Sequence, residues 1–313
     1  MSMRSPSGFI RPGFDPLKNP DAPTIGTATE GDAELSVTFT APAVVGGSAI
    51  TSYLATARKT SDGTLTGVSG ASSPIVVTSL TNGDAYTATV LAINSYGPSA
   101  ASAASNSVTP AVQIPTVGAA YEGGFFAGQI STAGNGVADY NLVVGPLATA
   151  ENSSKQWDNK NTATPGADSL IDGPQNTADM VADGNATVYP GAHFCNGVTS
   201  GGFSDWYMPA RNELEVCYYN LKPNTTSNSA AWGGNTNAVP SRGSNYTAGT
   251  PAQTSATIFQ GTNSEAFSAT LAYWSSTEAS ATQGFRQIFS YGGQYAETKS
   301  LSRRVRAVRR VAV

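Results

Sequence analysis

The chain has 313 residues, a formal net charge of −4 and a charged fraction of 12%, about half of the ~25% typical of soluble domains. This weak charge gives no reason to expect a nucleic-acid partner, and no apolar run approaches the roughly 20 residues needed to insert into a membrane. With one histidine and two cysteines, the usual general base and metal ligands are scarce, so we expect no enzyme, no metal and no cofactor. The length allows two domains, and the abundance of Gly, Ser, Thr and Asn predicts a mainly β chain.

Residues 1–22 are rich in Pro and Gly, and their apolar side chains are too few to build a core. We therefore expect an extended N-terminal arm that docks on a neighbouring protein. The apolar residues expected to make this contact are Phe9, Ile10, Phe14 and Leu17. The first residues lack the apolar core of a secretory signal, so we expect the chain to stay where it is made.

Residues 23–110 alternate apolar and polar side chains in short runs separated by turn signals such as "TSDGT" and "LTNGD". In "AELSVTFTAP", Leu35, Val37 and Phe39 fall on one face, and "AYTATVLAIN" repeats the pattern from Tyr86. Short strands at this spacing predict an antiparallel β-sandwich.

This region resembles a fibronectin type III domain. The resemblance rests on "PDAPTIG", "GGSAITSYLATAR", Leu80 and "NGDAYTATVLAINSYGPSAAS", the last of which carries the tyrosine corner. The large second-strand tryptophan of many such domains is absent, and Phe39 is its expected substitute. Because this fold alone implies no activity, we expect the domain to act as a spacer.

Residues 111–313 begin with two strand-like stretches, "GAAYEGGFFAGQI" and "YNLVVGPLA", followed by a long stretch at 149–180 that we expect to be irregular. Further on, Leu214, Cys217, Tyr218 and Leu221 lie at helical spacing. Pro209 precedes this helix, Glu213 and Glu215 lie toward the positive end of its dipole, and Pro223 ends it. Its charged residues therefore have local structural roles, and we assign none of them to catalysis.

Three blocks in this region, "DWYMP", "YWSS" and "VRAVR", resemble the C-type-lectin-like domains of bacterial and phage surface proteins. The resemblance implies an α+β fold with two helices, a small twisted sheet and long loops that display a variable binding face. We expect buried tryptophans with satisfied N–H groups, and arginine forks paired with Asp205, Glu213 or Glu278. The five terminal arginines otherwise fit a solvated strand edge. The expected scaffold residues are Asp205, Trp206, Pro209, Glu213, Trp274, Ser275, Ser276, Arg306 and Arg309.

Two segments, 230–255 and 290–300, are free of these blocks and mix aromatic side chains with amides and hydroxyls. That mixture suits sugar rings, which stack on aromatic faces while their hydroxyls find polar partners. The candidate ligand-binding residues are Trp232, Asn235, Asn237, Tyr246, Tyr291, Gln294 and Tyr295. The alternative is that these side chains pack against neighbouring loops or subunits.

Cys195 and Cys217 flank the "DWYMP" block closely enough that a disulfide is conceivable, although buried free thiols are the favoured state. A related oxidase fold uses a cysteine pair, so a close pair in an open pocket would indicate an enzyme.

Together these features predict a bacteriophage virion protein, a tail or collar fibre or a capsid decoration. It would be made in the host cytoplasm and be present in several copies, with other virion proteins bound at its arm. Its lectin-like head would bind a host-surface glycan or protein. The alternatives are a purely structural virion protein, a bacterial surface adhesin and an oxidase-fold enzyme.

Overall fold

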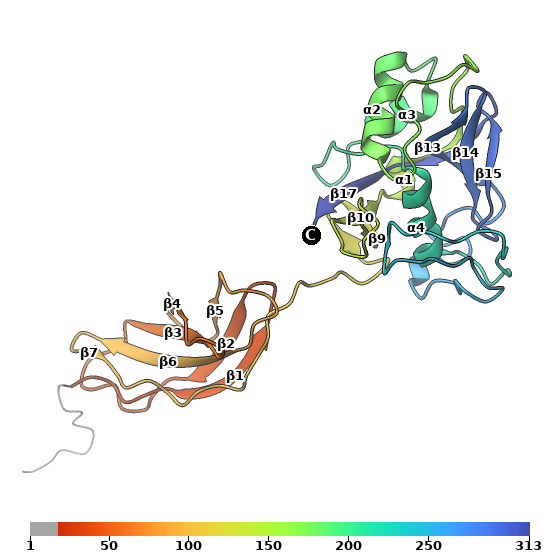
Figure 1. Ribbon diagram of the computed structural model, residues 1–313. Coiled ribbons are helices and arrows are strands. Elements are labelled where there is room, and N and C mark those ends of the chain that lie inside the picture. Colours follow the sequence, from red (N-terminus) through yellow and green to blue (C-terminus); the bar gives the residue numbers. More distant parts are fainter. Residues whose placement is uncertain (1–17) are drawn as a thin grey trace, which may run out of the picture. The chain divides into compact units, whose positions relative to one another are not determined.

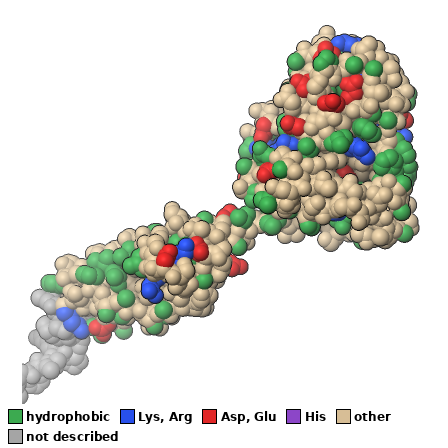
Figure 2. All heavy atoms as spheres, in the orientation of Figure 1, with side chains coloured by type: hydrophobic (Ala, Val, Ile, Leu, Met, Phe, Trp, Pro, Cys, Tyr) green, Lys and Arg blue, Asp and Glu red, His purple; other side chains and the backbone are tan. Residues whose placement is uncertain are grey.

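The computed structural model describes residues 18–313, which divide into two compact units, one ending at Ile114 and the other spanning Pro115–Val313 (Figure 1). The prediction of a mainly β chain is confirmed. The arm residues Phe9, Ile10, Phe14 and Leu17 lie outside the described part of the chain. On the visible faces of both units, charged side chains are scattered among uncharged polar groups (Figure 2). No helix within residues 18–313 has the length and apolar character needed to cross a bilayer.

The N-terminal unit is a sandwich of two antiparallel sheets. One sheet has the order β1-β2-β5, with strands Thr24–Glu30, Leu35–Thr40 and Ile75–Val77. The other has the order β4-β3-β6-β7, with strands Leu65–Gly70, Ser52–Lys59, Tyr86–Asn94 and Gly97–Pro98. Buried and partly exposed residues alternate along β2 and β6, as their sequences predict. This alternation places one face of each sheet in a shared core.

Phe39 and Tyr53 occupy part of this core, with their ring centroids 4.7 Å apart. Phe39 belongs to β2, where we expected it to replace a larger tryptophan. The Tyr86 hydroxyl accepts a hydrogen bond from the Thr81 backbone N–H at 3.1 Å, across the turn that leads into β6. This contact fixes the entry of the chain into the longest strand of the sandwich.

The tyrosine corner gives a direct stability test. Because Tyr86→Phe removes the acceptor of the Thr81 N–H in a partly buried hydrogen bond, we expect it to lower the free energy of unfolding of this unit by about 1 kcal/mol. Calorimetry would record this as a lower melting temperature for the N-terminal transition. Tyr96→Phe is the matched control, because Tyr96 is 49% exposed and its replacement should leave the transition unchanged. Equal effects from the two variants would contradict the structural role of the corner.

The C-terminal unit is an α+β structure built on two sheets. The first has the order β12-β9-β10-β17, with strands Ala238–Val239, Gly124–Ile130, Tyr140–Val144 and Val308–Ala312, and β8 (Ala120–Tyr121) also pairs with β9. The second has the order β11-β16-β13-β14-β15, with strands Glu151–Lys155, Arg303–Arg306, Ala272–Ser280, Gln283–Ile288 and Gln294–Thr298. The final segment of the chain therefore supplies one strand to each sheet.

Helices and a short 3-10 turn complete this unit: α1 (Leu147–Ala150), α2 (Gly173–Asp183), α3 (Pro190–Asn196), α4 (Arg211–Leu221) and the turn at Thr257–Phe259. The stretch 149–180 is less irregular than we expected, because it contains the end of α1, β11 and most of α2. Asp172 begins α2 by accepting the Gln175 N–H, and Pro174 occupies its first turn. An N-cap aspartate followed by a proline is a local helix signal, although the surrounding sequence is polar.

Helix α4 joins the two sheets. It follows Pro209 and packs on β9 of the first sheet and on β13 and β14 of the second. Its residues Leu214, Cys217, Tyr218 and Leu221 all lie in one apolar cluster, as their spacing predicts. At the helix start, Glu213 accepts the Ala210 backbone N–H at 2.8 Å. The helix is thus a rigid platform for the loops that leave it.

Candidate functional site

The tryptophans of the sequence blocks lie in one apolar cluster of the C-terminal unit. Trp206 is buried and donates its indole N–H to Phe203 O at 3.2 Å, and Trp274 is buried and reaches Lys155 O at 3.1 Å. Ser275 and Ser276 are buried beside Trp274, and Ser276 N donates to Pro209 O at 2.8 Å. The "YWSS" strand is therefore bonded directly to the end of the "DWYMP" block.

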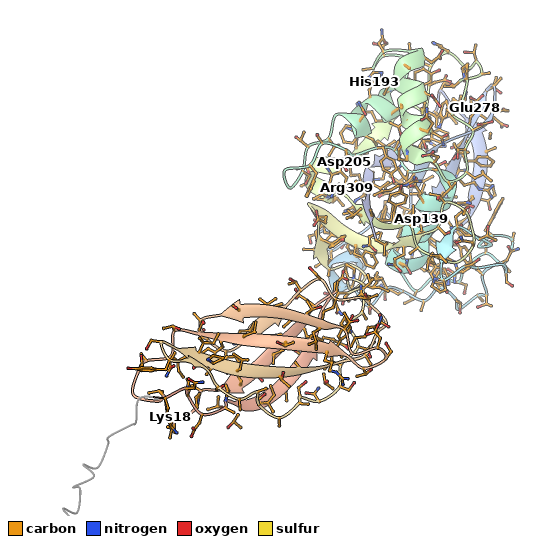
Figure 3. All side chains as sticks on the ribbon, turned by 60° about the vertical axis from the view of Figure 1, so that its left-hand side comes forward. Lys18, Asp139, His193, Asp205, Glu278 and Arg309 are labelled. Carbon is orange, nitrogen blue, oxygen red and sulfur yellow. The ribbon has the colours of Figure 1, made fainter. Side chains whose placement is uncertain are left out.

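Arg309 forms the bidentate pair expected of a scaffold arginine. Its Nε and Nη2 donate to the two Asp205 oxygens at 2.8 and 2.9 Å, and the two side chains meet in Figure 3. Arg306 has a different partner from those we expected, because it donates to Glu265 Oε2 at 2.7 Å and to two backbone carbonyls.

The other two expected acceptors also have different partners. Glu213 pairs with Arg310, and Glu278 pairs with Lys299. The interpretation of the terminal arginines as a solvated edge is wrong, because each of them is in an ion pair within the fold. The arginines are Arg303, Arg304, Arg306, Arg309 and Arg310.

Several candidate ligand-binding residues turn out to be internal. Glu215 of α4 is buried and accepts hydrogen bonds from Asn235, from the Tyr246 hydroxyl at 2.7 Å and from Arg242. Burial raises the pKa of the Glu215 carboxyl, and Arg242, Tyr246 and Asn235 partly oppose this rise. The prediction that Asn235 and Tyr246 contact a ligand is therefore wrong. Both side chains position the 230–255 loop on α4.

Gln294 is also buried, against the prediction, and exchanges hydrogen bonds with Arg211. Asn237 is half-buried, and its amide donates to Ser131 O at 2.8 Å while its oxygen accepts from Asn212. The amides of Gln294 and Asn237 thus form hydrogen bonds with backbone and side-chain groups of the fold. Composition alone does not distinguish such amides from exposed ones.

The remaining candidates, Trp232, Tyr291 and Tyr295, form what we call the aromatic patch. The rings of Trp232 and Tyr295 meet edge to face, with centroids 5.3 Å apart and an interplanar angle of 71°. Tyr295 is 37% exposed, and Trp232 and Tyr291 are half-buried. The structure thus brings residues from both predicted segments together at one surface.

Two glycines make the turn that carries this patch. Gly292 has φ of +79°, and an added Cβ would lie 2.4 Å from Tyr218 Cε1. At Gly293, a Cβ would lie 2.6 Å from both the Tyr291 and Tyr295 rings. The tyrosines approach each other across this turn because neither glycine carries a side chain.

Two arginines border the patch. The Arg211 guanidinium lies 5.9 Å from the Trp232 ring, and the Arg286 guanidinium lies 5.4 Å from the Tyr295 ring. Partial burial and a hydrogen bond with Tyr295 raise the pKa of Tyr291. The patch therefore combines apolar ring surface with hydrogen-bond donors, as sugar binding requires.

Within residues 18–313, no group of three or more His, Cys, Asp or Glu side chains is placed to hold a metal ion. His193 Nε2 lies 2.7 Å from Gly184 O, within the scaffold. Cys195 and Cys217 are free, buried and in separate apolar clusters, so the disulfide does not form. The close, open cysteine pair required by the oxidase alternative is not present.

A cavity of about 490 Å³, which no sequence motif indicates, lies beside the loop 261–270 and is also lined by Glu151 and Arg304. A smaller cavity of about 340 Å³ lies at residues 241–247, inside a predicted segment. The loop 261–270 is rich in small and polar residues, as much of the chain is, so its composition does not indicate a cavity.

The N-terminal unit is a fibronectin type III domain, since the family model of that name matches residues 21–108. Among solved structures, the chain is 27% identical to the fourth FNIII domain of a human protein, which covers 35% of this chain and 94% of that one with a TM-score of 0.28. It is 26% identical to domains A168–A170 of titin (30% and 33% covered, TM-score 0.28) and 25% identical to a titin kinase structure with its flanking domains (30% covered, TM-score 0.28). The chain spans only 17% of the length of the latter. No curated protein matches the chain.

Proposed function

We propose that this chain is an adhesion-type structural protein of a bacteriophage particle. In this proposal the fibronectin type III domain is a spacer and the C-terminal unit is a C-type-lectin-like head that binds a host-surface glycan. The N-terminal arm docks on other virion proteins. The observation that carries the proposal is the aromatic patch, Trp232, Tyr291 and Tyr295, bordered by Arg211 and Arg286.

A glycan suits this surface better than an apolar peptide. The Trp232 and Tyr295 rings provide stacking area, while the tyrosine hydroxyls and guanidinium groups provide polar partners at its edge. The patch is small, so a single head would bind weakly. Several copies on one particle would sum such contacts into useful avidity.

The exposure of Tyr295 supports a binding role for the aromatic patch over a role in packing alone. Asn235, Tyr246 and Gln294 are satisfied inside the fold, whereas the Tyr295 ring stays exposed next to the buried Gln294 in β15. A large aromatic side chain held in place at a surface marks a binding site more often than an isolated exposed residue does.

A glycan array probed with the full-length chain tests the proposal. We expect binding to at least one class of bacterial surface sugar, and we expect Trp232→Ala and Tyr295→Ala each to weaken it by about tenfold, the loss of ~1.4 kcal/mol of stacking. Tyr96→Ala is the matched control, because Tyr96 is an exposed tyrosine of the fibronectin type III domain.

Unchanged binding in both patch variants would contradict the choice of surface. An absence of binding to any sugar or to intact bacteria would favour the alternative of a purely structural protein.

A further inference from the structure

A buried lysine lies between two carboxylates, away from the aromatic patch. Lys299 follows β15, and its Nζ is 3.1 Å from Asp158 Oδ2 and 3.4 Å from Glu278 Oε1. The side chains of Lys299 and Asp158 are both fully buried, and that of Glu278 is 10% exposed (Glu278 is labelled in Figure 3). Three ionisable groups therefore meet where water has almost no access.

The two oxygens of Asp158 are held differently. Oδ1 accepts the Asn161 backbone N–H at 2.7 Å. Oδ2 has no hydrogen-bond partner, although the amine lies 3.1 Å away, so the amine approaches it without hydrogen-bond alignment. Nζ instead donates to Thr162 O at 2.8 Å. The carboxyl group is thus fixed and polarised at one oxygen while the other faces the amine unbonded.

The backbone holds both partners in this position. Trp157 N donates to Lys299 O at 3.0 Å, and Lys299 N donates to Thr282 O at 3.1 Å. The Trp157 ring lies 4.3 Å from Nζ, and its indole N–H is satisfied by Ser275 O. Because the residues on each side of the contact are bonded to one another, the amine and the carboxyl carbon cannot easily move apart. Such fixed proximity is the main requirement for a reaction between two groups that are unreactive in water.

We propose that Lys299 and Asp158 condense to an intramolecular isopeptide bond, with Glu278 carrying the proton. In the first step a proton passes from Nζ to Oδ2, which leaves a neutral amine beside a neutral carboxylic acid. The Nζ lone pair then forms a bond to Cγ, and the C=O electron pair moves to Oδ1, where the Asn161 N–H stabilises the negative charge.

The nitrogen next gives a proton to Glu278. The Cγ–Oδ2 bond breaks as the electron pair returns from Oδ1, and the departing oxygen takes the proton from Glu278 and leaves as water. The sum is one ammonium and one carboxylate converted into one amide and one water molecule. Glu278 ends as the carboxylate it was at the start, so no other reactant is needed.

The position of Glu278 suits this role. Its Oε2 accepts the Thr164 backbone N–H at 2.7 Å, which fixes the side chain, while Oε1 faces the amine. Glu278 also lines a cavity of about 340 Å³ with residues 163–166 and 279–280. This cavity gives the released water a path out of the interior.

Burial also favours the amide over the ion pair. A buried ion pair keeps the cost of removing its charges from water, whereas the amide removes both of those charges. The bond would join the loop after β11 to the segment between β15 and β16, and so lock together parts of the head far apart in sequence. It would resist separation of those segments under load.

Mass spectrometry of the full-length chain tests the proposal. After purification and overnight incubation at neutral pH, we expect a denatured chain lighter than its sequence by one water molecule. Trypsin should then give a branched peptide that joins residues 156–160 to residues 287–303 and is uncut at Lys299. The free 156–160 peptide should be absent.

Two outcomes would overturn the proposal. One is recovery of the free 156–160 peptide in full yield. The other is loss of water without the branched peptide, which indicates dehydration elsewhere in the chain.

Three variants separate the chemistry from a folding defect. Glu278→Gln keeps an acceptor for Thr164 N–H but cannot take a proton, so we expect cross-linking to slow by about a hundredfold or more in a folded chain. Lys299→Arg keeps the charge and should give the unreduced mass. Lys160→Arg is the matched control, because Lys160 forms an exposed ion pair with Asp183, and the variant keeps the trypsin site and should leave the cross-link intact. Wild-type rates in Glu278→Gln would overturn the role of Glu278.

Discussion

Arg306→Ala is expected to lower the free energy of unfolding of the C-terminal unit by about 3–5 kcal/mol, the range for breaking a buried charge pair. The Arg306 side chain is fully buried and donates to Gly145 O, Glu265 O and Glu265 Oε2. Removing it leaves Gly145 O and Glu265 O without this donor, leaves the Glu265 carboxylate without its charge partner, and opens a cavity beside the Phe267 ring, 4.8 Å from the guanidinium. Urea unfolding followed by tryptophan fluorescence measures the change, because every tryptophan of the chain lies between residues 157 and 274, in this unit.

Arg303→Ala is the matched control for this prediction. Arg303 comes from the same strand but pairs with Glu297 near the surface, with a side chain 30% exposed. An exposed pair of this kind contributes about 0–1 kcal/mol. A cost for Arg306→Ala no larger than that for Arg303→Ala would show that the buried pair is not a main support of the head.

The strands and the helix that could be predicted from the sequence are those that depend on a pattern within a few neighbouring residues. The alternation along β2 and β6, the four apolar positions of α4, and the prolines that flank this helix each depend on neighbours within a few residues. Periods of about 2 and about 3.6 residues follow directly from strand and helix geometry. Such elements can be predicted from the sequence whatever the rest of the chain does.

The partners of the charged residues could not be predicted in this way. Glu265 lies in a loop with no distinguishing motif, yet it is the acceptor for Arg306, 41 positions away. Glu215 lies in a helix where a glutamate normally faces solvent, and only the folded 230–255 loop shows that it is buried. A charged side chain has the same local pattern whether it is paired inside the fold or exposed.

The candidate site could be predicted only in part, because the hydrogen-bond partners of its amide side chains also depend on the fold. Trp232, Tyr291 and Tyr295, which come from the two predicted segments, do meet at one surface. Amides bind backbone groups as well as they bind sugar hydroxyls, so their role depends on which of the two lies within reach. The fold places Asn235 and Gln294 against internal partners.

Glu215→Ala is expected to have an effect of similar size to Arg306→Ala, about 3–5 kcal/mol, because it leaves the donors of Asn235, Arg242 and Tyr246 without their common acceptor. The effect should reach the aromatic patch, since Tyr246 N donates to Trp232 O at 2.7 Å. Hydrogen exchange should therefore accelerate across residues 230–250, and glycan binding should fall even in the folded fraction. Exchange confined to α4 would contradict this link.

Glu215→Gln separates the charge of this residue from its shape. Burial raises the pKa of Glu215 in the folded state above its ordinary value, so the folded chain holds this proton more tightly than the unfolded chain does. The stability contributed by such a group is complete below the unfolded-state pKa and is lost as the pH rises through the raised folded-state pKa. Glutamine does not titrate. Glu213, the other buried glutamate of α4, is present in both proteins, so its contribution cancels when the two are compared. The free energy of unfolding of the wild type minus that of Glu215→Gln should therefore decrease in urea titrations over the pH range that starts at about pH 4 and runs upward. A difference that increases over this range would mean that the pairing of Glu215 with Arg242 outweighs its burial.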